Sequence, residues 1–194
     1  MAIEGSAGLE RSELILGGQK SGKSRRSETL AQSWLQGGAG RSAWLLATGM
    51  AFDTEMQARI ARHQRDRAER VPGMQTEEVP LDLAAALRER SQPGCLLVID
   101  CLTMWLTNWM MPAQGTYSEQ AWGAQRTAFL QALAQARGPV VIVGNEIGLG
   151  VIPLGSEVRA FVDALGVLNQ QVAAACSRVT LMCAGLPLTL KDGA

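Results

Sequence analysis

An eight-residue stretch, GGQKSGKS at 17–24, has the spacing of a loop that binds phosphate. It matches G-x-x-x-x-G-K-[ST] and lies between an apolar run and a helical pattern, a context that makes a chance match improbable. Its glycines let backbone N–H groups point at phosphate oxygens, and the start of a helix favours negative charge. Lys23 is expected to contact the terminal phosphates, and Ser24 to bind Mg²⁺. The predicted nucleotide-binding residues here are Gly17, Gly18, Gln19, Lys20, Ser21, Gly22, Lys23 and Ser24.

A carboxylate follows a second apolar run, CLLVID, which ends at Asp100. P-loop proteins place an acid that helps to hold Mg²⁺ at the end of a neighbouring strand. An aspartate that merely ends a strand is the alternative, and the presence of the phosphate loop favours the metal role. We therefore predict that Ser24 and Asp100 are the Mg²⁺ ligands, with Asp100 also close to the nucleotide.

The only histidine of the chain, His63, lies among arginines in ARIARHQRDR at 58–67. A solvated basic helix is the simplest interpretation. A nucleophile that handles phosphate is the alternative, because imidazole forms covalent intermediates and guanidinium groups bind phosphate oxygens. Steps of three and four residues place His63, Arg67 and Arg70 on one face of a helix.

A third polar segment, GNEIGLGVIP at 144–153, follows another apolar run. Ligands bind beyond the carboxyl ends of the strands in an open parallel sheet, so Asn145 and Glu146 are expected to point into the site. By position, Glu146 is a candidate for the base that deprotonates a substrate hydroxyl. Gly148 and Gly150 would let the loop fold over a bulky ligand, although a turn without a ligand has the same pattern.

The elements that position these residues alternate between apolar runs and helical patterns. This alternation predicts an α/β fold, P-loop NTPase-like, with a mostly parallel sheet and helices on both faces. Residues 186–191 are a further candidate strand, paired with the last apolar run. The predicted strands are 13–18, 42–48, 95–100, 138–146 and 178–185, and the predicted helices are 24–36, 54–70, 81–90, 117–137 and 157–177.

Leu102, Trp105, Leu106 and Trp109 recur at helical spacing in LTMWLTNWMMP. Such an apolar stripe is more often core or subunit interface than a platform for a ligand. Asn108 faces another side of the same helix and is a candidate for polar lining of a site.

Length and composition indicate one globular domain. The 194 residues suffice for a single core, with a flexible tail at 1–11 and one catalytic domain at 12–194. Lys+Arg and Asp+Glu both number 18, and this balance argues against a nucleic-acid-binding protein. Neither a leader peptide nor a membrane span is expected, and the four cysteines form no CxxC pair. We expect a cytoplasmic protein with reduced, buried thiols.

The order of these motifs resembles the bifunctional adenosylcobinamide kinase / adenosylcobinamide-phosphate guanylyltransferase family of cobalamin biosynthesis. The resemblance spans about 14–191, through GGQKSGKSRRSE, LLAT, DTEMQARIARHQRDR, DCLTMWLTN, NEIGLGVIP and DALGVLNQ. It implies phosphorylation of the aminopropanol hydroxyl of adenosylcobinamide with ATP or GTP. GMP would then pass from GTP through a guanylylated histidine to that phosphate, giving adenosylcobinamide-GDP and pyrophosphate.

The resemblance also implies roles for individual residues. His63 matches the family's guanylylated histidine, and Val71 stands where the family often has an aromatic residue. ATP, GTP and a corrinoid would be the substrates, with Mg²⁺ and no permanent cofactor, in a homo-oligomer that is a trimer by resemblance. The further nucleotide contacts it implies are Met50, Ala51, Phe52, Arg67, Ala68, Glu69, Arg70 and Glu78.

Two other functions stay open at this point. One is a P-loop kinase of another small alcohol without a covalent intermediate, which needs neither a histidine among arginines nor the loop at 144–153. The other is a nucleotide-gated binding module without catalysis, which does not need Lys23, Ser24 and Asp100 together.

Overall fold

The computed structural model describes residues 12–51 and 54–193. The predicted tail at 1–11 and the predicted nucleotide contact Phe52 therefore lie outside the described residues. The elements in chain order are β1 (Glu13–Gly17), α1 (Lys23–Gln36), β2 (Ser42–Ala47), α2 (Thr54–Arg70), β3 (Gln75–Glu78), α3 (Leu83–Arg90), β4 (Cys95–Asp100), α4 (Leu102–Met110), α5 (Glu119–Ala134), β5 (Val140–Val143), α6 (Ser156–Ala175), β6 (Arg178–Cys183) and β7 (Leu186–Asp192).

These strands form one seven-stranded sheet in the order β3-β2-β4-β5-β1-β6-β7. All neighbours pair in parallel except β6 and β7, which form an antiparallel hairpin at one edge. The central strands β1, β4 and β5 are almost entirely buried, as strands covered on both faces must be. The predicted α/β fold with a mostly parallel sheet is confirmed, and so is the pairing of the last strand.

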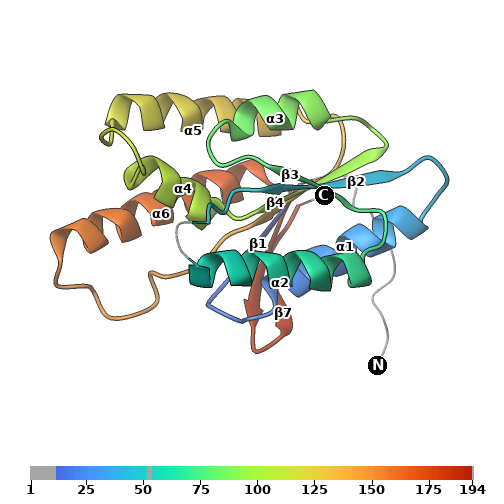
Figure 1. Ribbon diagram of the computed structural model, residues 1–194, viewed down its shortest axis with the longest axis horizontal. Helices are drawn as coiled ribbons and strands as arrows, with labels where there is room; N and C mark the ends of the chain where they lie inside the picture. Colours follow the sequence, from blue (N-terminus) through green and yellow to red (C-terminus); the bar gives the residue numbers. More distant parts are fainter. Residues whose placement is uncertain (1–11, 52–53, 194) are drawn as a thin grey trace.

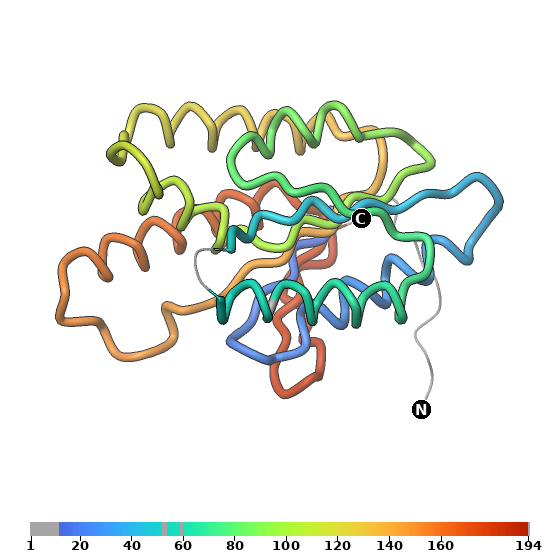
Figure 2. Tube along the Cα trace, viewed as in Figure 1, coloured from blue at the N-terminus to red at the C-terminus, as the bar shows by residue number. Residues whose placement is uncertain are grey.

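Helices cover both faces of the sheet (Figures 1 and 2). On one face α1 lies against the sheet. Its Ala31 and Val71, the residue after α2, belong to a core that includes Ile15, Leu45 and Val98. On the other face, α3, α4, α5 and α6 bury a larger core. The parallel connections place the strand ends that precede α1, α2, α4 and the 144–155 loop at a single edge of the sheet.

The tryptophans of α4 belong to the core of the subunit. Trp105 is fully buried. It packs edge-on against Trp122 and with tilted rings against Phe129, and the ring centroids are 4.9 and 5.1 Å apart. Trp109 is partly buried against the same core. The core interpretation of the stripe is therefore confirmed for Trp105, Leu102 and Leu106, which are fully buried, while Trp109 is partly exposed.

Two expectations from the sequence were wrong. Asn108 lines no site, because its side chain is buried and its amide donates to the carbonyls of Thr48 and Pro80. Cys183 is exposed rather than buried, although all four cysteines are free thiols. No helix in the described part of the chain is long and apolar enough to cross a membrane.

Candidate active site

The phosphate loop connects β1 to α1. Three of its residues have positive φ, Gly17 at 151°, Lys20 at 55° and Gly22 at 103°, so the backbone turns back on itself before α1 begins. The Lys23 side chain is only 8% exposed, and its ammonium donates to the Gly18 carbonyl at 2.6 Å. Burial lowers the pKa of Lys23, while Cys101 and Asp100 act in the opposite direction. The amine therefore lies across the loop, at the position where a phosphate oxygen would compete for it.

Gly17 allows β1 to pass very close to β6. Its φ is 151°, and a Cβ at this position would lie 2.5 Å from the Met182 carbonyl oxygen and 2.6 Å from Ser21 Oγ. Gly22 likewise faces the β6–β7 turn, where its Cβ would lie 3.3 Å from Gly185 Cα. Only glycine combines these dihedral angles with so close an approach.

Asp100 ends β4 and faces the start of α1. Ser24 Oγ donates to Asp100 Oδ2 at 3.2 Å, so the two predicted metal ligands are adjacent. Thr48, which follows β2, holds Cys101, the residue after Asp100. The Thr48 hydroxyl accepts from the Cys101 N–H at 2.8 Å and donates to the Cys101 carbonyl at 2.7 Å. Burial raises the pKa of Asp100, and the Ser24 hydrogen bond and then the charges of Arg67, His63 and Lys23 lower it.

Helix α2 carries His63 and Arg67 toward this carboxylate. The helix has the predicted bounds 54–70. His63 is exposed, but it lies close enough to Asp100 to act on its pKa. Burial lowers the pKa of Arg67, with Asp100 and Glu28 opposing, and its guanidinium donates to Thr76 Oγ1 at 3.3 Å. The predicted face of α2 is thus directed at the phosphate-loop side of the sheet.

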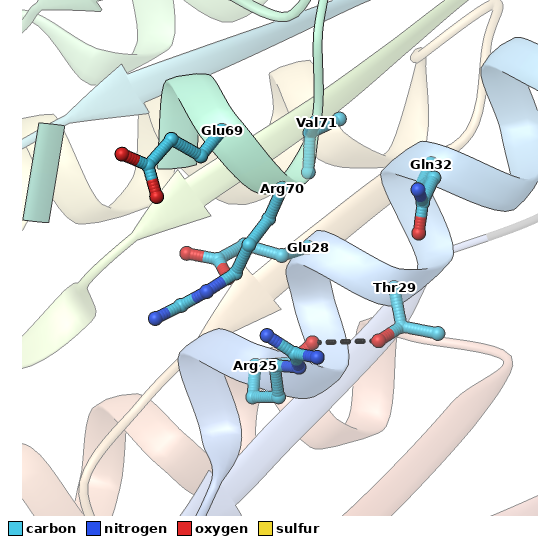
Figure 3. A pocket seen from close by; sticks show the side chains of 7 residues that line it. All are labelled: Arg25, Glu28, Thr29, Gln32, Glu69, Arg70 and Val71. Atoms are coloured by element: carbon cyan, nitrogen blue, oxygen red, sulfur yellow. Dashed lines mark hydrogen bonds and ion pairs between the residues drawn. The ribbon is translucent and has the colours of Figure 1, made fainter. Parts of the chain in front are cut away.

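The end of α2 meets α1 across a small cavity. Glu69 and Arg70 line it, and the Arg70 guanidinium bonds to Glu28 of α1 at 2.8 Å and to Asp66 at 3.2 Å. Neither the 17–24 loop nor Asp100 is among the residues that line this cavity. Its volume is about 210 Å³, and its lining, drawn in Figure 3, is Arg25, Glu28, Thr29, Gln32, Glu69, Arg70 and Val71.

The loop after β5 is attached to the phosphate loop. The backbone N–H of Glu146 donates to the Gly17 carbonyl at 3.1 Å. Both backbone groups of Asn145 are held by side chains, its N–H by Thr103 Oγ1 and its carbonyl by the Asn169 amide, each at 3.1 Å. The Glu146 carboxylate accepts from the Gly148 N–H at 2.8 Å, so in this structure it is bonded within its own loop.

The remaining predicted contacts are spread along the same region. Met50 is half-buried and Ala51 exposed, in the segment that follows β2. Glu78 is exposed at the end of the edge strand β3, and Ala68 is exposed on α2. No group of three or more His, Cys, Asp or Glu side chains that could hold a metal ion occurs in residues 12–51 and 54–193.

The sequence did not single out four residues that hold the site together. Thr48, Thr103 and Asn169 position backbone at the strand ends, and Glu28 binds Arg70. Their partners lie between 24 and 53 positions away along the chain, so no local pattern indicates them. All four nevertheless stand in segments that carry the family resemblance, which are GGQKSGKSRRSE for Glu28, LLAT for Thr48, DCLTMWLTN for Thr103 and DALGVLNQ for Asn169.

The fold and the site together define a P-loop NTPase-like protein of the α/β class, with a phosphate loop after β1 and a partner carboxylate after β4. Residues 13–190 match the family described as cobinamide kinase / cobinamide phosphate guanyltransferase, and the chain belongs to that family. It is therefore a transferase with these two activities, and the choice left open by the motifs falls to the bifunctional enzyme.

Two relatives are similar over nearly their whole length. The bifunctional adenosylcobalamin biosynthesis protein CobP of Pseudomonas aeruginosa is 44% identical over 92% of this chain and 96% of its own. The bifunctional adenosylcobalamin biosynthesis protein CobU of Escherichia coli is 32% identical over 92% of this chain and 98% of its own. Among solved structures, the flagellar accessory protein FlaH of Methanocaldococcus jannaschii aligns with a TM-score of 0.53 over 95% of this chain and 79% of its own. At 13% sequence identity, this is a likeness of fold alone.

Substituting Gly17→Ala should destabilise the protein. The added methyl group would meet a backbone carbonyl of β6 at 2.5 Å, so the phosphate loop or the strand must shift. The clash and the positive φ of Gly17 together should lower the free energy of unfolding by on the order of 1–3 kcal/mol. Urea denaturation measures this change. Gly18→Ala is the matched control, because its Cβ would meet nothing within 4 Å. Equal stability of the two variants would contradict the close approach at Gly17.

Proposed function

We propose that this enzyme phosphorylates the aminopropanol hydroxyl of adenosylcobinamide and then transfers GMP to that phosphate through a histidine–GMP intermediate. The observation that carries the proposal is the convergence of His63 and Arg67 from α2, Lys23 from the phosphate loop and Asp100 from β4. The three side chains act on that carboxylate although they come from two segments of the chain and the carboxylate from a third. A kinase without a covalent intermediate would not need the histidine.

In the kinase step, the loop at 17–24 holds the phosphates of ATP or GTP. Backbone N–H groups from Gly18 to Ser24 bind phosphate oxygens, and Lys23 exchanges its hydrogen bond with the Gly18 carbonyl for one to a terminal phosphate. The substrate hydroxyl attacks the γ-phosphorus while the bond to the β-phosphate breaks. Glu146 is the candidate base for the hydroxyl proton, and taking that role requires its carboxylate to release the Gly148 N–H.

Ser24 and Asp100 are the residues that would hold Mg²⁺. Their oxygens lie 3.2 Å apart, and both are hard oxygen ligands of the kind that Mg²⁺ prefers alongside water and phosphate. The ion would neutralise charge on the phosphates during transfer. Burial raises the pKa of the Asp100 carboxyl group in the absence of an ion, and a bound cation would favour its ionised form.

In the guanylyl step, His63 is the nucleophile. One imidazole nitrogen forms a bond to the α-phosphorus of GTP, the bond from that phosphorus to the β-phosphate oxygen breaks, and pyrophosphate leaves. An oxygen of the cobinamide phosphate then attacks the same phosphorus, and the nitrogen–phosphorus bond breaks. Arg67 stabilises charge on the phosphoryl oxygens in both displacements. Met50, Ala51, Phe52, Ala68, Glu69 and Glu78 stay proposed nucleotide contacts on the family resemblance, whereas the Arg70 guanidinium binds Glu28 of α1.

We also propose that the enzyme is a homo-oligomer, a trimer by resemblance to the family. Because Trp105 is internal and Trp109 is partly buried against the same core, we propose that a different surface supplies the contact. The loop that follows Glu146 exposes large apolar side chains, with Val151 at 96% and Leu154 at 97%. Monomeric proteins seldom expose such a contiguous apolar patch, and a second copy would cover it.

Asp100→Asn should raise the Mg²⁺ concentration required for half-maximal rate. An amide oxygen is a weaker ligand than a carboxylate, so the rate at limiting Mg²⁺ should fall. Changing a residue that only supports a metal ligand typically costs roughly 10- to 100-fold in activity, and we expect at least that loss here. Steady-state assays over a Mg²⁺ series measure this. Asp163→Asn, an exposed change on α6, is the control. An unchanged Mg²⁺ dependence would remove Asp100 from the metal site.

His63→Ala should abolish covalent guanylylation. Incubation of the parent protein with GTP and Mg²⁺, without corrinoid, should add the mass of one GMP in an acid-labile, base-stable bond. The variant should lose this adduct and guanylyl transfer, but keep ATP-dependent phosphorylation, which needs no histidine. Gln64→Ala, the adjacent exposed residue, is the matched control and should form the adduct. An adduct on His63→Ala would place the nucleophile elsewhere.

Leu154→Asp should lower the oligomeric mass in solution. A buried carboxylate in an apolar interface is strongly unfavourable, so multi-angle light scattering should show a shift toward the 20.7 kDa monomer. Leu190→Asp, at another exposed leucine on β7, tests whether the effect is specific to the loop. A parent protein that is itself a clean monomer at micromolar concentration would refute the assembly.

A further inference from the structure

Helix α2 is attached to the rest of the protein at its C-terminal end. Val71, which follows the helix, is 2% exposed in the core beside α1. Arg67 donates to Thr76 on β3, and Arg70 reaches α1. By contrast, residues 61–65, which include His63, are all exposed. The attachment near Arg67–Val71 therefore contributes to where the exposed histidine lies.

The contact between α2 and α1 centres on one ion pair. The Arg70 Nη1 atom lies 2.8 Å from Glu28 Oε2, and the Glu28 side chain is only 8% exposed. Figure 3 shows the two side chains reaching toward each other from the two helices, beside the small cavity described above. The hydrogen bond with Glu28 is the main cause that raises the pKa of Arg70. Asp66, one turn earlier on α2, binds the other side of the same guanidinium at 3.2 Å.

Glu28 belongs to the helix that begins the phosphate site. It follows Lys23 by five residues on α1, so one rigid element carries both the phosphate loop's lysine and the attachment point of α2. His63 precedes Arg70 by seven residues, which is roughly 10 Å along a helix axis. A small tilt at the attachment is amplified over that length, and displacements of about 1 Å are enough to cost about 100-fold in rate.

We infer that Glu28 is a positioning residue for guanylyl transfer, which acts through Arg70 to hold His63 at the α-phosphate of a nucleotide bound at the start of α1. The inference rests on the proposed role of His63 as the nucleophile. It gives Arg70 a partner within the protein, in place of the direct nucleotide contact that the family resemblance implies. It also explains why a carboxylate is nearly buried on a helix whose neighbouring positions at Arg25 and Thr29 are exposed.

The test is a double-mutant cycle on the full-length enzyme with Glu28→Gln, Arg70→Gln and both together. The rate of GMP adduct formation is followed by intact mass over a GTP series, and ATP-dependent phosphorylation of cobinamide is measured separately. Glu77→Gln is the matched control, because it removes a Glu–Arg pair of the same 2.8 Å length, with Arg90, away from α2. Circular dichroism reports folding, and Arg70→Gln, at a 38% exposed side chain, covers the case in which Glu28→Gln does not fold.

The expected result is a split between the two reactions. Each single variant should slow adduct formation at saturating GTP on the order of 10- to 100-fold, with little change in the half-saturating GTP concentration. The double variant should be no slower than the slower single, because both changes remove one interaction. Phosphorylation should change by no more than about threefold, since it does not use His63, and Glu77→Gln should match the parent.

Three results would overturn the inference. Adduct formation at the parental rate in Glu28→Gln or Arg70→Gln would show that the pair does not position His63. Additive losses with a raised half-saturating GTP concentration would show that Arg70 acts on the nucleotide directly. Equal losses of both reactions would show a general structural role. His63→Ala, assayed in parallel, separates these from failure of the proposed function: an adduct on that variant refutes the nucleophile, whatever the Glu28 variants do.

Discussion

Parallel strands that end at one edge of the sheet are the constraint on which the whole site depends. Asp100 is in register with Ala47 on one side and with Val143 on the other, and Ile15 is in register with Val143. The segments that leave these strands therefore meet, and short hydrogen bonds join them: Ser24 to Asp100, Thr48 to Cys101, and the Glu146 N–H to Gly17. None of these contacts would form if one central strand were reversed.

Lys23 and Arg67 both act on the single carboxylate of Asp100 before any nucleotide arrives. Burial alone would favour a protonated Asp100, and the cations around it oppose that effect. The same cations are themselves partly desolvated, since burial lowers the pKa of both Lys23 and Arg67. A phosphate chain brings the additional negative charge that such desolvated cations lack. Nucleotide binding is therefore favoured electrostatically at the point where the kinase and guanylyl steps both need stabilised phosphoryl oxygens.

Helix α2 stands apart because its sequence is polar on nearly every side. A helix of this composition gains little from burial of an apolar face, so its position depends on ion pairs and on the buried residue that follows it. The ion pair of Arg70 with Glu28, the hydrogen bond of Arg67 to Thr76 and the burial of Val71 hold the helix in place. This arrangement leaves His63 accessible to large substrates while its backbone stays attached to α1 and β3.

Much of the fold could be predicted from the sequence, because local patterns encode it. The apolar run at 95–100 and the helix at 54–70 have their predicted bounds. The strand β3 was not predicted, since QTEE has no apolar residue and becomes a strand only by pairing with β2. Asn108 was misassigned for a similar reason: helical spacing shows which side a residue faces, but not that backbone carbonyls of Thr48 and Pro80 lie there.

The sequence by itself determined the chemistry of this protein: a phosphate loop, a strand-ending carboxylate and a single histidine among arginines, each recognisable from residue types at short spacing. The tertiary structure alone decided how these groups meet. It shows Ser24 beside Asp100, the charges of His63 and Arg67 acting on that carboxylate, and Glu28 paired with Arg70. The physical reason is that these partners are separated by tens of residues, so only the packing of helices on a parallel sheet brings them together.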